Sequence, residues 1–182
     1  MTTALQSIPL KTIANQEASL ADYAGKVVLV VNVASKCGLT PQYEGLEKLH
    51  RDYSVSGLVV TGFPANDFGA QEPGSDAEIA DFCRTNFSVD FPMFSKIAVT
   101  GPTKHPLYAA LISAVPQAQG EGSDFRDKLR SHGMTPTEAP EVLWNFEKFL
   151  VGRDGNVAAR FAPTTAPDDP TLVAAIEAEL AK

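Results

Sequence analysis

The amino-acid sequence predicts an α/β fold in which a central mixed β-sheet is flanked by helices. Two apolar runs, residues 26–33 and 58–63, have the composition of strands that are buried on both faces. A stretch with helical spacing lies between them, and this order gives parallel strands with a right-handed crossover. Nearer the C-terminus, the Asp-Gly pair within residues 153–156 predicts a hairpin, which adds antiparallel strands to the same sheet.

The first helix is expected over residues 41–53. Thr40 and Pro41 are the residue types that favour the N-cap and the first helical position, and Ser56-Gly57 marks the end of the helical stretch. One side of this helix is apolar, because large hydrophobic residues recur at spacings of three and four: Tyr43, Leu46, Leu49 and Tyr53. The preceding segment gives a weaker pattern, with a short hairpin near residues 12–15.

A second helix is expected after the turn-rich loop of residues 64–74. Ser75, followed three positions later by Glu78, forms a capping box that predicts the helix start. The inward face of this helix consists of Ile79, Phe82, Cys83 and Phe87. Residues 91–99 are then expected to be extended, and residues 107–115 have the spacing of a short amphipathic helix.

The last third of the chain begins with a polar connection rich in Pro and Gly, residues 116–141, in which we expect one short helix near residues 125–130. Residues 143–151 are expected to form a strand, and residues 157–161 its returning partner. Asp169 precedes a proline at the start of the last helix, whose apolar stripe is Leu172, Val173, Ile176 and Leu180. Together these elements have the plan of a thioredoxin-like fold.

Length and composition indicate one globular domain spanning residues 1–182. Hydrophobic residues make up 44% of the chain and charged residues 20%, as in ordinary soluble proteins. The net charge of −7 is spread along the sequence, which argues against nucleic acid binding and stable membrane association. Residues 1–20 lack the basic cluster and apolar run of a signal peptide, so we expect a cytoplasmic protein. The histidines have no metal-ligand spacing, and we expect no metal and no cofactor.

Cys37 is the candidate for chemistry, because it is expected in the short loop between the first strand and the first helix. The unpaired N–H groups and the positive dipole end of a helix N-terminus favour a thiolate there, and neighbouring Lys36 acts in the same direction. A thiolate is the form that nucleophilic and redox chemistry requires. The alternative interpretation is that Cys37 is a small apolar residue buried at the end of a strand.

The loop after this cysteine carries no second sulfur. A Cys-x-x-Cys motif is absent from residues 37–40, so ordinary dithiol exchange within the loop is not expected. Four separated motifs instead resemble the glutathione peroxidase family, and most closely its bacterial cysteine-containing members, the thioredoxin/glutathione peroxidases. These motifs are residues 32–38, residues 62–64 with 68–74, residues 91–94 and residues 144–151. The resemblance runs from about residue 25 to the C-terminus and implies a thioredoxin fold.

The resemblance implies a catalytic tetrad of Cys37, Gln71, Trp144 and Asn145. A thiolate attacks one oxygen of a hydroperoxide, the O–O bond breaks, and negative charge grows on the departing oxygen. N–H donors on the two amides and on the indole suit both the thiolate and that charge. Taken alone, Trp144 is also explained as a core aromatic and Gln71 as a solvated turn residue, while Asn145 is not diagnostic.

The resemblance further implies that Cys83 resolves the sulfenic acid formed on Cys37, and that thioredoxin reduces the resulting disulfide. Hydrogen peroxide and organic or lipid hydroperoxides are the implied substrates. If Cys83 is buried, its helix must open, because a disulfide needs Cα atoms within about 7 Å of each other. Cys83 is also explained as a buried residue of a helix face. Ala65 stands where many relatives have a third cysteine, and Asp67 stands where Gln is common.

Other functions stay open from the sequence alone. Glutathione is the alternative reductant, with Cys83 as a bystander and with Lys36, Arg126 and Arg153 as candidate anchors for its carboxylates. A redox sensor would pass its oxidation to a partner protein instead of turning over. A binding module without catalysis is disfavoured by the complete tetrad. We expect a monomer.

Overall fold

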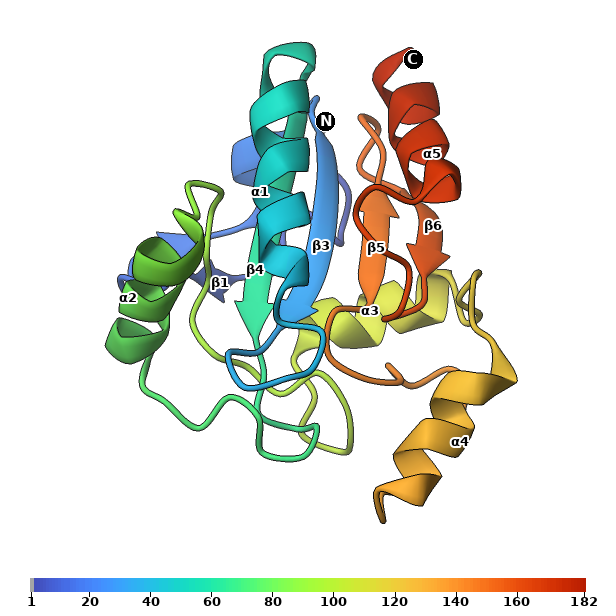
Figure 1. Cartoon of the computed structure of the whole chain (residues 1–182). Helices are drawn as coiled ribbons and strands as arrows, with labels where there is room; N and C mark the ends of the chain where they lie inside the picture. The colour runs from blue at the N-terminus through green and yellow to red at the C-terminus, as the bar shows by residue number, and fades with distance from the viewer. Residues whose placement is uncertain (1) are drawn as a thin grey trace.

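A computed structural model describes residues 2–182, apart from the side chain of Ser123. Met1, which belongs to the segment used to argue against a signal peptide, lies outside the described residues. The main sheet has the strand order β4-β3-β5-β6, in which β4 is parallel to β3 and the other pairs are antiparallel (Figure 1). Its strands are β3 (Val27–Val33), β4 (Leu58–Pro64), β5 (Lys148–Val151) and β6 (Val157–Phe161). The predicted mixed sheet is therefore present.

The register of the sheet places three chain segments at one edge. Val33 at the end of β3 pairs with Pro64 at the end of β4. On the other side of β3, Val31 pairs with Lys148, the first residue of β5. The loops that follow β3 and β4, and the loop that precedes β5, consequently meet at the same edge. This is the edge at which open α/β sheets carry their sites.

Helices cover both faces of this sheet (Figure 1). Helices α1 (Gln42–Tyr53) and α5 (Pro170–Leu180) lie on one face, α2 (Asp76–Phe87) lies beside α1, α3 (Pro106–Ala114) covers the other face, and α4 (Ser123–Ser131) lies to one side. On the α3 face, Tyr108 meets Phe63 and Phe149 edge-on at centroid distances of 6.2 and 6.0 Å. Every residue of β3 and β4 is buried, as their continuous apolar sequences predict.

The remaining elements are short. Strands β1 (Leu10–Lys11) and β2 (Glu17–Ala18) form a separate antiparallel pair, and two 3-10 helices, η1 (Leu20–Tyr23) and η2 (Ser54–Ser56), precede β3 and β4. The hairpin expected near residues 12–15 is this β1-β2 pair.

Capping residues correctly predicted two helix starts, and the Asp-Gly pair correctly predicted one turn. Ser75 accepts a hydrogen bond from the N–H of Glu78 at 3.2 Å, and the reciprocal bond completes the capping box of α2. Asp169 caps α5 by accepting from the N–H of Thr171 at 2.8 Å. Gly155 has a φ of 80° in the β5-β6 turn, a conformation that favours glycine.

Two local predictions were wrong. Pro41, not Thr40, occupies the N-cap of α1, because the Thr40 hydroxyl instead bonds the N–H of Cys37. The strand expected over residues 143–151 is confined to β5. The preceding residues are buried but form a turn, in which Phe146 has a φ of 68°. Burial explains the apolar sequence of this turn, and positive φ is incompatible with a strand.

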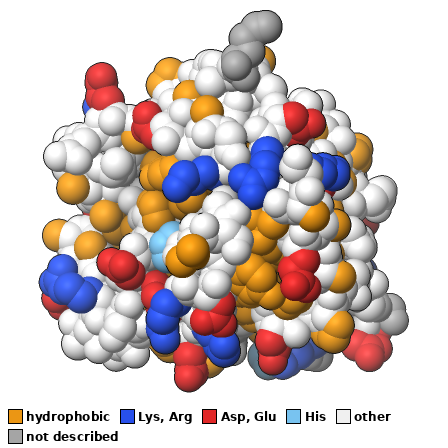
Figure 2. All heavy atoms as spheres, turned by 90° about the horizontal axis from the view of Figure 1, so that it is seen from above, with side chains coloured by type: hydrophobic (Ala, Val, Ile, Leu, Met, Phe, Trp, Pro, Cys, Tyr) orange, Lys and Arg blue, Asp and Glu red, His pale blue; other side chains and the backbone are white. Residues whose placement is uncertain are grey.

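Acidic and basic side chains are interspersed on the face seen from above, and hydrophobic side chains lie in the hollows between them (Figure 2). Val55, at 95% exposure, is the large hydrophobic residue that projects from the described surface. Within residues 2–182, no helix has both the length and the apolar character needed to cross a bilayer.

Candidate active site

Cys37 lies in the loop between β3 and α1, and its side chain is only 9% exposed. Its backbone N–H donates to the Thr40 hydroxyl at 3.0 Å, and that hydroxyl donates to the carbonyl of Ala34 at 2.8 Å. The sulfur accepts a hydrogen bond from the N–H of Leu39 at 3.3 Å. The loop therefore directs a backbone donor at the sulfur immediately before α1 begins.

The loop after β4 lies directly against the Cys37 loop. The N–H of Lys36 donates to the carbonyl of Gln71 at 3.0 Å, and the N–H of Ser35 donates to the Glu72 carboxylate at 3.0 Å. Within its own loop, the N–H of Glu72 donates to the side chain of Asn66 at 2.9 Å. Two backbone donors of the Cys37 loop thus position Gln71 and Glu72.

The loop before β5, which carries Trp144 and Asn145, is attached to β3 through Asn32. The buried Asn32 amide donates to the carbonyl of Trp144 at 3.0 Å, and the carbonyl of Asn32 accepts from the N–H of Phe146 at 2.6 Å. The positive φ of Phe146 turns the chain so that both bonds form. Asn32 is the polar residue of an otherwise apolar strand interior, a signal that sequence inspection could have used.

The predicted amides contact each other directly. The Asn145 amide donates to the side-chain oxygen of Gln71 at 2.9 Å, and the Trp144 ring lies 5.4 Å from that of Phe68 between centroids. Asn145 is fully buried, Trp144 is 7% exposed and Gln71 is partly exposed. The structure therefore brings the loops of all four predicted tetrad residues to one sheet edge. In the described part of the chain, the hydrogen bond on the sulfur comes from Leu39, while the Gln71 oxygen is bonded to Asn145.

A buried ion pair supports the loop of Trp144, and sequence analysis did not identify it. Arg160 on β6 contacts Glu147 at 2.6 Å, with side chains that are 2% and 1% exposed. Glu147 also accepts from the N–H of Leu143 at 3.1 Å, and Arg160 donates to the carbonyls of Val115, Pro140 and Glu141. Burial raises the pKa of Glu147, and the positive charge of Arg160 opposes that rise.

A second missed residue, Lys148, connects β5 to the start of α1. Its fully buried ammonium donates to the Gln42 side chain at 2.6 Å and to the carbonyl of Pro163 at 3.0 Å, and the Gln42 amide donates to the same carbonyl at 2.9 Å. Burial lowers the pKa of Lys148 to about 7, although the charge of Glu147 favours the protonated form. A lysine within a buried strand is the sequence signal for such a contact.

Cys83 lies on α2, apart from the three loops at the sheet edge. Both cysteines are free thiols, and Cys83 is 2% exposed. Burial raises the pKa of the Cys83 thiol to about 11, the neighbouring Tyr43 hydroxyl opposes the rise, and the charge of Glu72 adds to it. In the folded state shown here, Cys83 is therefore a buried thiol on the inward face that the sequence predicted for this helix.

Asp67 and Ala65, the two positions that the resemblance singled out as departures from the family pattern, have clear surroundings. The Asp67 carboxylate accepts a hydrogen bond from the N–H of Val99 at 2.6 Å, so it anchors the segment after β4 to residues 91–99. Ala65 is buried at 1% exposure.

The sequence model of the family described as glutathione peroxidase matches residues 5–112. Thioredoxin/glutathione peroxidase BtuE of Escherichia coli strain K12 is 51% identical over 174 residues, which cover 95% of both chains. The chain belongs to the glutathione peroxidase family.

Further relatives agree with this membership. The hydroperoxy fatty acid reductase Gpx2 of a Synechocystis strain is 51% identical over 157 residues, which are 86% of each chain. A crystal structure described as Trgpx in apo form matches with a TM-score of 0.72 and 35% identity, and covers 100% of this chain and 98% of the other. Similarity to a thioredoxin family protein, at 11% identity, concerns the fold alone and agrees with the predicted thioredoxin-like fold. This glutathione peroxidase family member is a peroxidase, which implies a hydroperoxide substrate and a thiol reductant.

Proposed function

We propose that the protein is a thiol peroxidase that reduces hydrogen peroxide and organic or lipid hydroperoxides at Cys37. The Cys37 thiolate attacks the terminal peroxide oxygen, a sulfur–oxygen bond forms, and the O–O bond breaks. Cys37 becomes a sulfenic acid, and the departing oxygen takes up a proton to leave as an alcohol or as water. The observation that carries this proposal is the convergence of the Cys37, Gln71 and Trp144-Asn145 loops at one sheet edge.

In this proposal Gln71, Trp144 and Asn145 supply N–H donors to the thiolate and to the departing oxygen. The Asn145–Gln71 bond supports this role, because it engages the Gln71 oxygen and leaves the Gln71 NH₂ group available to donate. Such donors act strongly when they are oriented before the reaction begins. Asn145 is therefore assigned partly as a positioning residue for Gln71.

A hollow beside Trp144 supports organic hydroperoxides as substrates. It has a volume of about 200 Å³, and much of its wall is apolar. Its lining residues are Asp67, Phe68, Gly69, Thr100, Met134, Thr135, Thr137, Leu143 and Trp144. The name of the Synechocystis relative, a hydroperoxy fatty acid reductase, points in the same direction.

We assign Cys83 as the resolving cysteine and thioredoxin as the reductant. The name of the E. coli relative, thioredoxin/glutathione peroxidase, includes this reductant. Because Cys83 is buried on α2, disulfide formation requires this helix to open or move.

Glutathione is the alternative reductant. Of its three candidate anchors, Arg153 donates to the carbonyls of Gly25, Ser56 and Leu180. Arg126 bonds Glu121 and the carbonyl of Thr137. Lys36 is exposed and lies beside Cys37. Since two of the three cations are engaged elsewhere in the fold, this structure favours thioredoxin.

Intact mass after one equivalent of peroxide tests the proposal. The wild type should lose two hydrogens as the disulfide forms, whereas Cys83→Ser should gain oxygen on Cys37. An identical fate of Cys37 in both proteins would remove Cys83 from the reaction. Steady-state consumption of peroxide with thioredoxin and its reductase, compared with glutathione and its reductase, assigns the reductant. A single oxidation without turnover in either system would indicate a sensor.

A further inference from the structure

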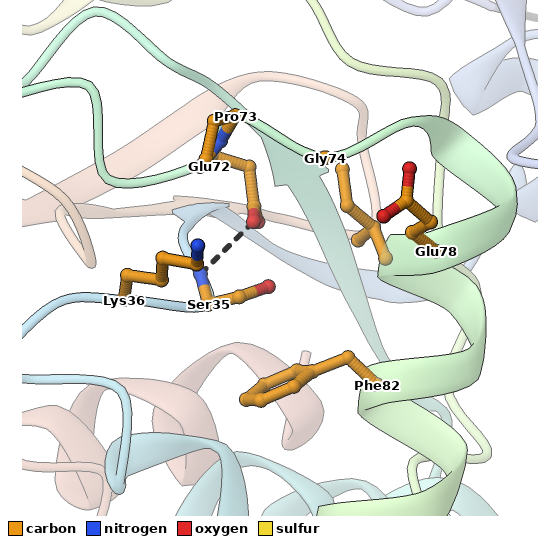
Figure 3. Close-up of a pocket in the computed structure, with 8 residues that line it drawn as sticks. Ser35, Lys36, Glu72, Pro73, Gly74, Glu78 and Phe82 are labelled. Carbon is orange, nitrogen blue, oxygen red and sulfur yellow. Dashed lines mark hydrogen bonds between the residues drawn. The ribbon is translucent and has the colours of Figure 1, made fainter.

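A cavity separates the loop of Cys37 from the helix of Cys83. Its volume is about 310 Å³. Ser35 and Lys36 line it from the Cys37 loop, residues 72–74 from the loop after β4, and Ile79 and Phe82 from α2. Figure 3 shows Lys36 and Ser35 on one side of this cavity and Phe82 of α2 on the other. Two of these residues, Lys36 and Phe82, directly precede Cys37 and Cys83 in the chain, so the cavity lies beside both cysteine positions.

Glu72 is the buried carboxylate at this place. Its side chain is only 1% exposed, and one oxygen accepts from the N–H of Ser35, the bond drawn in Figure 3. The other oxygen has no hydrogen-bond partner within residues 2–182, apart from the undescribed Ser123 side chain. A buried carboxylate oxygen without a partner is costly, and such groups in native proteins frequently have a functional role.

The charged and titratable groups around Glu72 come from four segments. Lys36 lies on the Cys37 loop and Lys96 on the segment after α2, and both positive charges lower the pKa of the carboxyl group. Burial has the largest effect and raises that pKa, and hydrogen bonding with Ser35 opposes the rise more strongly than the two lysines do. On the facing helices, the charge of Glu72 raises the pKa of Cys83 on α2 and of Tyr43 on α1, so the carboxylate lies within electrostatic reach of the thiol.

We propose that Glu72 is the general base that removes the proton from Cys83 when the disulfide with Cys37 forms. The inference rests on the proposed function, because it concerns the second step of that reaction. It goes beyond that function by assigning a residue outside the tetrad to the resolving step.

The Cys83 sulfur attacks the Cys37 sulfur, an S–S bond forms, and the S–O bond of the sulfenic acid breaks. The Cys83 proton passes to Glu72 and then to the departing hydroxide, which leaves as water. Cys83 is oxidised, the sulfenic sulfur is reduced, and Glu72 returns to its starting state. A base assists because attack requires the Cys83 thiolate, and in the folded state burial raises the pKa of this thiol to about 11.

The other groups near the cavity are less suited to this role. Glu78 is exposed in the first turn of α2 and is engaged in the capping box with Ser75. Tyr43 carries a hydroxyl whose pKa is raised well above its ordinary value by burial, so it is a poor proton acceptor at neutral pH.

Single-turnover kinetics test this inference. Trp144 is the sole tryptophan, so its fluorescence follows the reaction, and thiol trapping with intact mass analysis identifies the species in each phase. A peroxide-dependent phase should persist in Glu72→Gln, which shows that the variant folds. The peroxide-independent phase of disulfide formation should slow by about 10²-fold, the lower end of a general-base effect. Glu72→Asp should retain part of the rate, and Glu78→Gln, a second carboxyl of the same cavity, should match the wild type.

The pH profile separates catalysis from a structural or purely electrostatic role. In the wild type, disulfide formation should slow as the pH falls through the pKa of Glu72. In Glu72→Gln the rate of disulfide formation should instead rise about tenfold per pH unit as the pH increases toward the pKa of Cys83. If Glu72 acts only by its charge, removing that charge lowers the pKa of Cys83 and accelerates the step. An acceleration, or an unchanged rate and profile, would overturn the inference. Absence of a disulfide in the wild type would instead refute the proposed function.

Discussion

The side chain of Asn145 donates a 2.9 Å hydrogen bond to the side chain of Gln71, across 74 positions of the chain. Gln71 is bonded to Lys36 in the loop that follows β3, and the neighbours of Asn145, Trp144 and Phe146, are bonded to Asn32 in β3. Strand β3 and the Cys37 loop that follows it therefore align both amides relative to Cys37.

Replacing either amide should slow the oxidation of Cys37. Gln71→Ala is expected to lower the second-order rate with peroxide by about 10²-fold, as loss of one oriented donor does in other enzymes. Because Asn145 acts partly through Gln71, the double variant should lose less than the sum of the two single losses in free energy. Stopped-flow fluorescence measures the rates, and thermal unfolding checks that the fold is retained. Strict additivity would contradict the positioning role of Asn145.

Thr40→Val should weaken the Cys37 loop. The change keeps the side-chain shape but removes the hydroxyl that accepts from the N–H of Cys37 and donates to the carbonyl of Ala34. A buried N–H without a partner costs about 1–3 kcal/mol, so the free energy of unfolding should fall by that amount. Peroxide should also react more slowly because the sulfur is less well positioned. Thr40→Ser, which keeps the hydroxyl, is the matched control in urea unfolding.

Arg160→Met should destabilise the protein by about 3–5 kcal/mol at pH 7, because Glu147 then carries an unpaired buried charge. Burial raises the pKa of Glu147. A carboxyl whose folded-state pKa exceeds its unfolded value binds protons preferentially in the folded state, so the variant should recover stability as the pH falls through that pKa. Urea unfolding between pH 7 and pH 5 measures this recovery. Adding Glu147→Gln should restore part of the loss at pH 7, and no restoration would contradict the ion-pair interpretation.

Lys148 should make the free energy of unfolding increase as the pH rises above neutral. Its folded-state pKa of about 7 lies below its ordinary value of 10.5. Between these values the unfolded chain binds the additional proton, so the folded state gains stability relative to Lys148→Met as the pH rises. The unfolding free energy of the wild type minus that of Lys148→Met should increase by about 2 kcal/mol from pH 7 to pH 9. Lys48→Met, at an exposed lysine, should show no such growth. A flat difference would mean that the two hydrogen bonds of Lys148 preserve its ordinary protonation.

Cys83 should resist alkylation in the folded protein at neutral pH. It is 2% exposed, and burial raises its pKa to about 11, so it is neither accessible nor ionised. Mass analysis after brief iodoacetamide treatment should find one modified cysteine, Cys37, and urea should make the second reactive. Rapid modification of Cys83 without denaturant would indicate that α2 opens readily in the reduced protein.

Sequence patterns predicted the fold best where local chemistry determines the structure. The apolar runs of β3 and β4 fit strands buried on both faces, and Ser75 and Asp169 cap their helices by local bonds. The turn before β5 was missed because its apolar side chains are buried without belonging to a strand. Its conformation depends on the bonds that Asn32 makes with residues more than a hundred positions away.

The active site, like the fold, was predicted from the sequence only in part. Motifs identified Cys37, Gln71, Trp144 and Asn145 as a group, but their supports are long-range contacts that a single sequence does not reveal. Glu72, for example, meets Ser35 across 37 positions. A charged or amide side chain inside an apolar strand is the available signal, and Arg160 in β6 is an instance of it.

The seven paired positions of β3 and β4 have a consequence for the chemistry. A slip of one residue would displace the Gln71 loop by about 3.3 Å along the strand and exchange the faces of its side chains. The register of β3 and β4 therefore determines the position of the Gln71 loop relative to the reactive sulfur. Substitutions near Val28 or Val59 that weaken the pairing of β3 with β4 should reduce peroxide turnover at temperatures where the protein is still folded, although these positions are far from the sulfur.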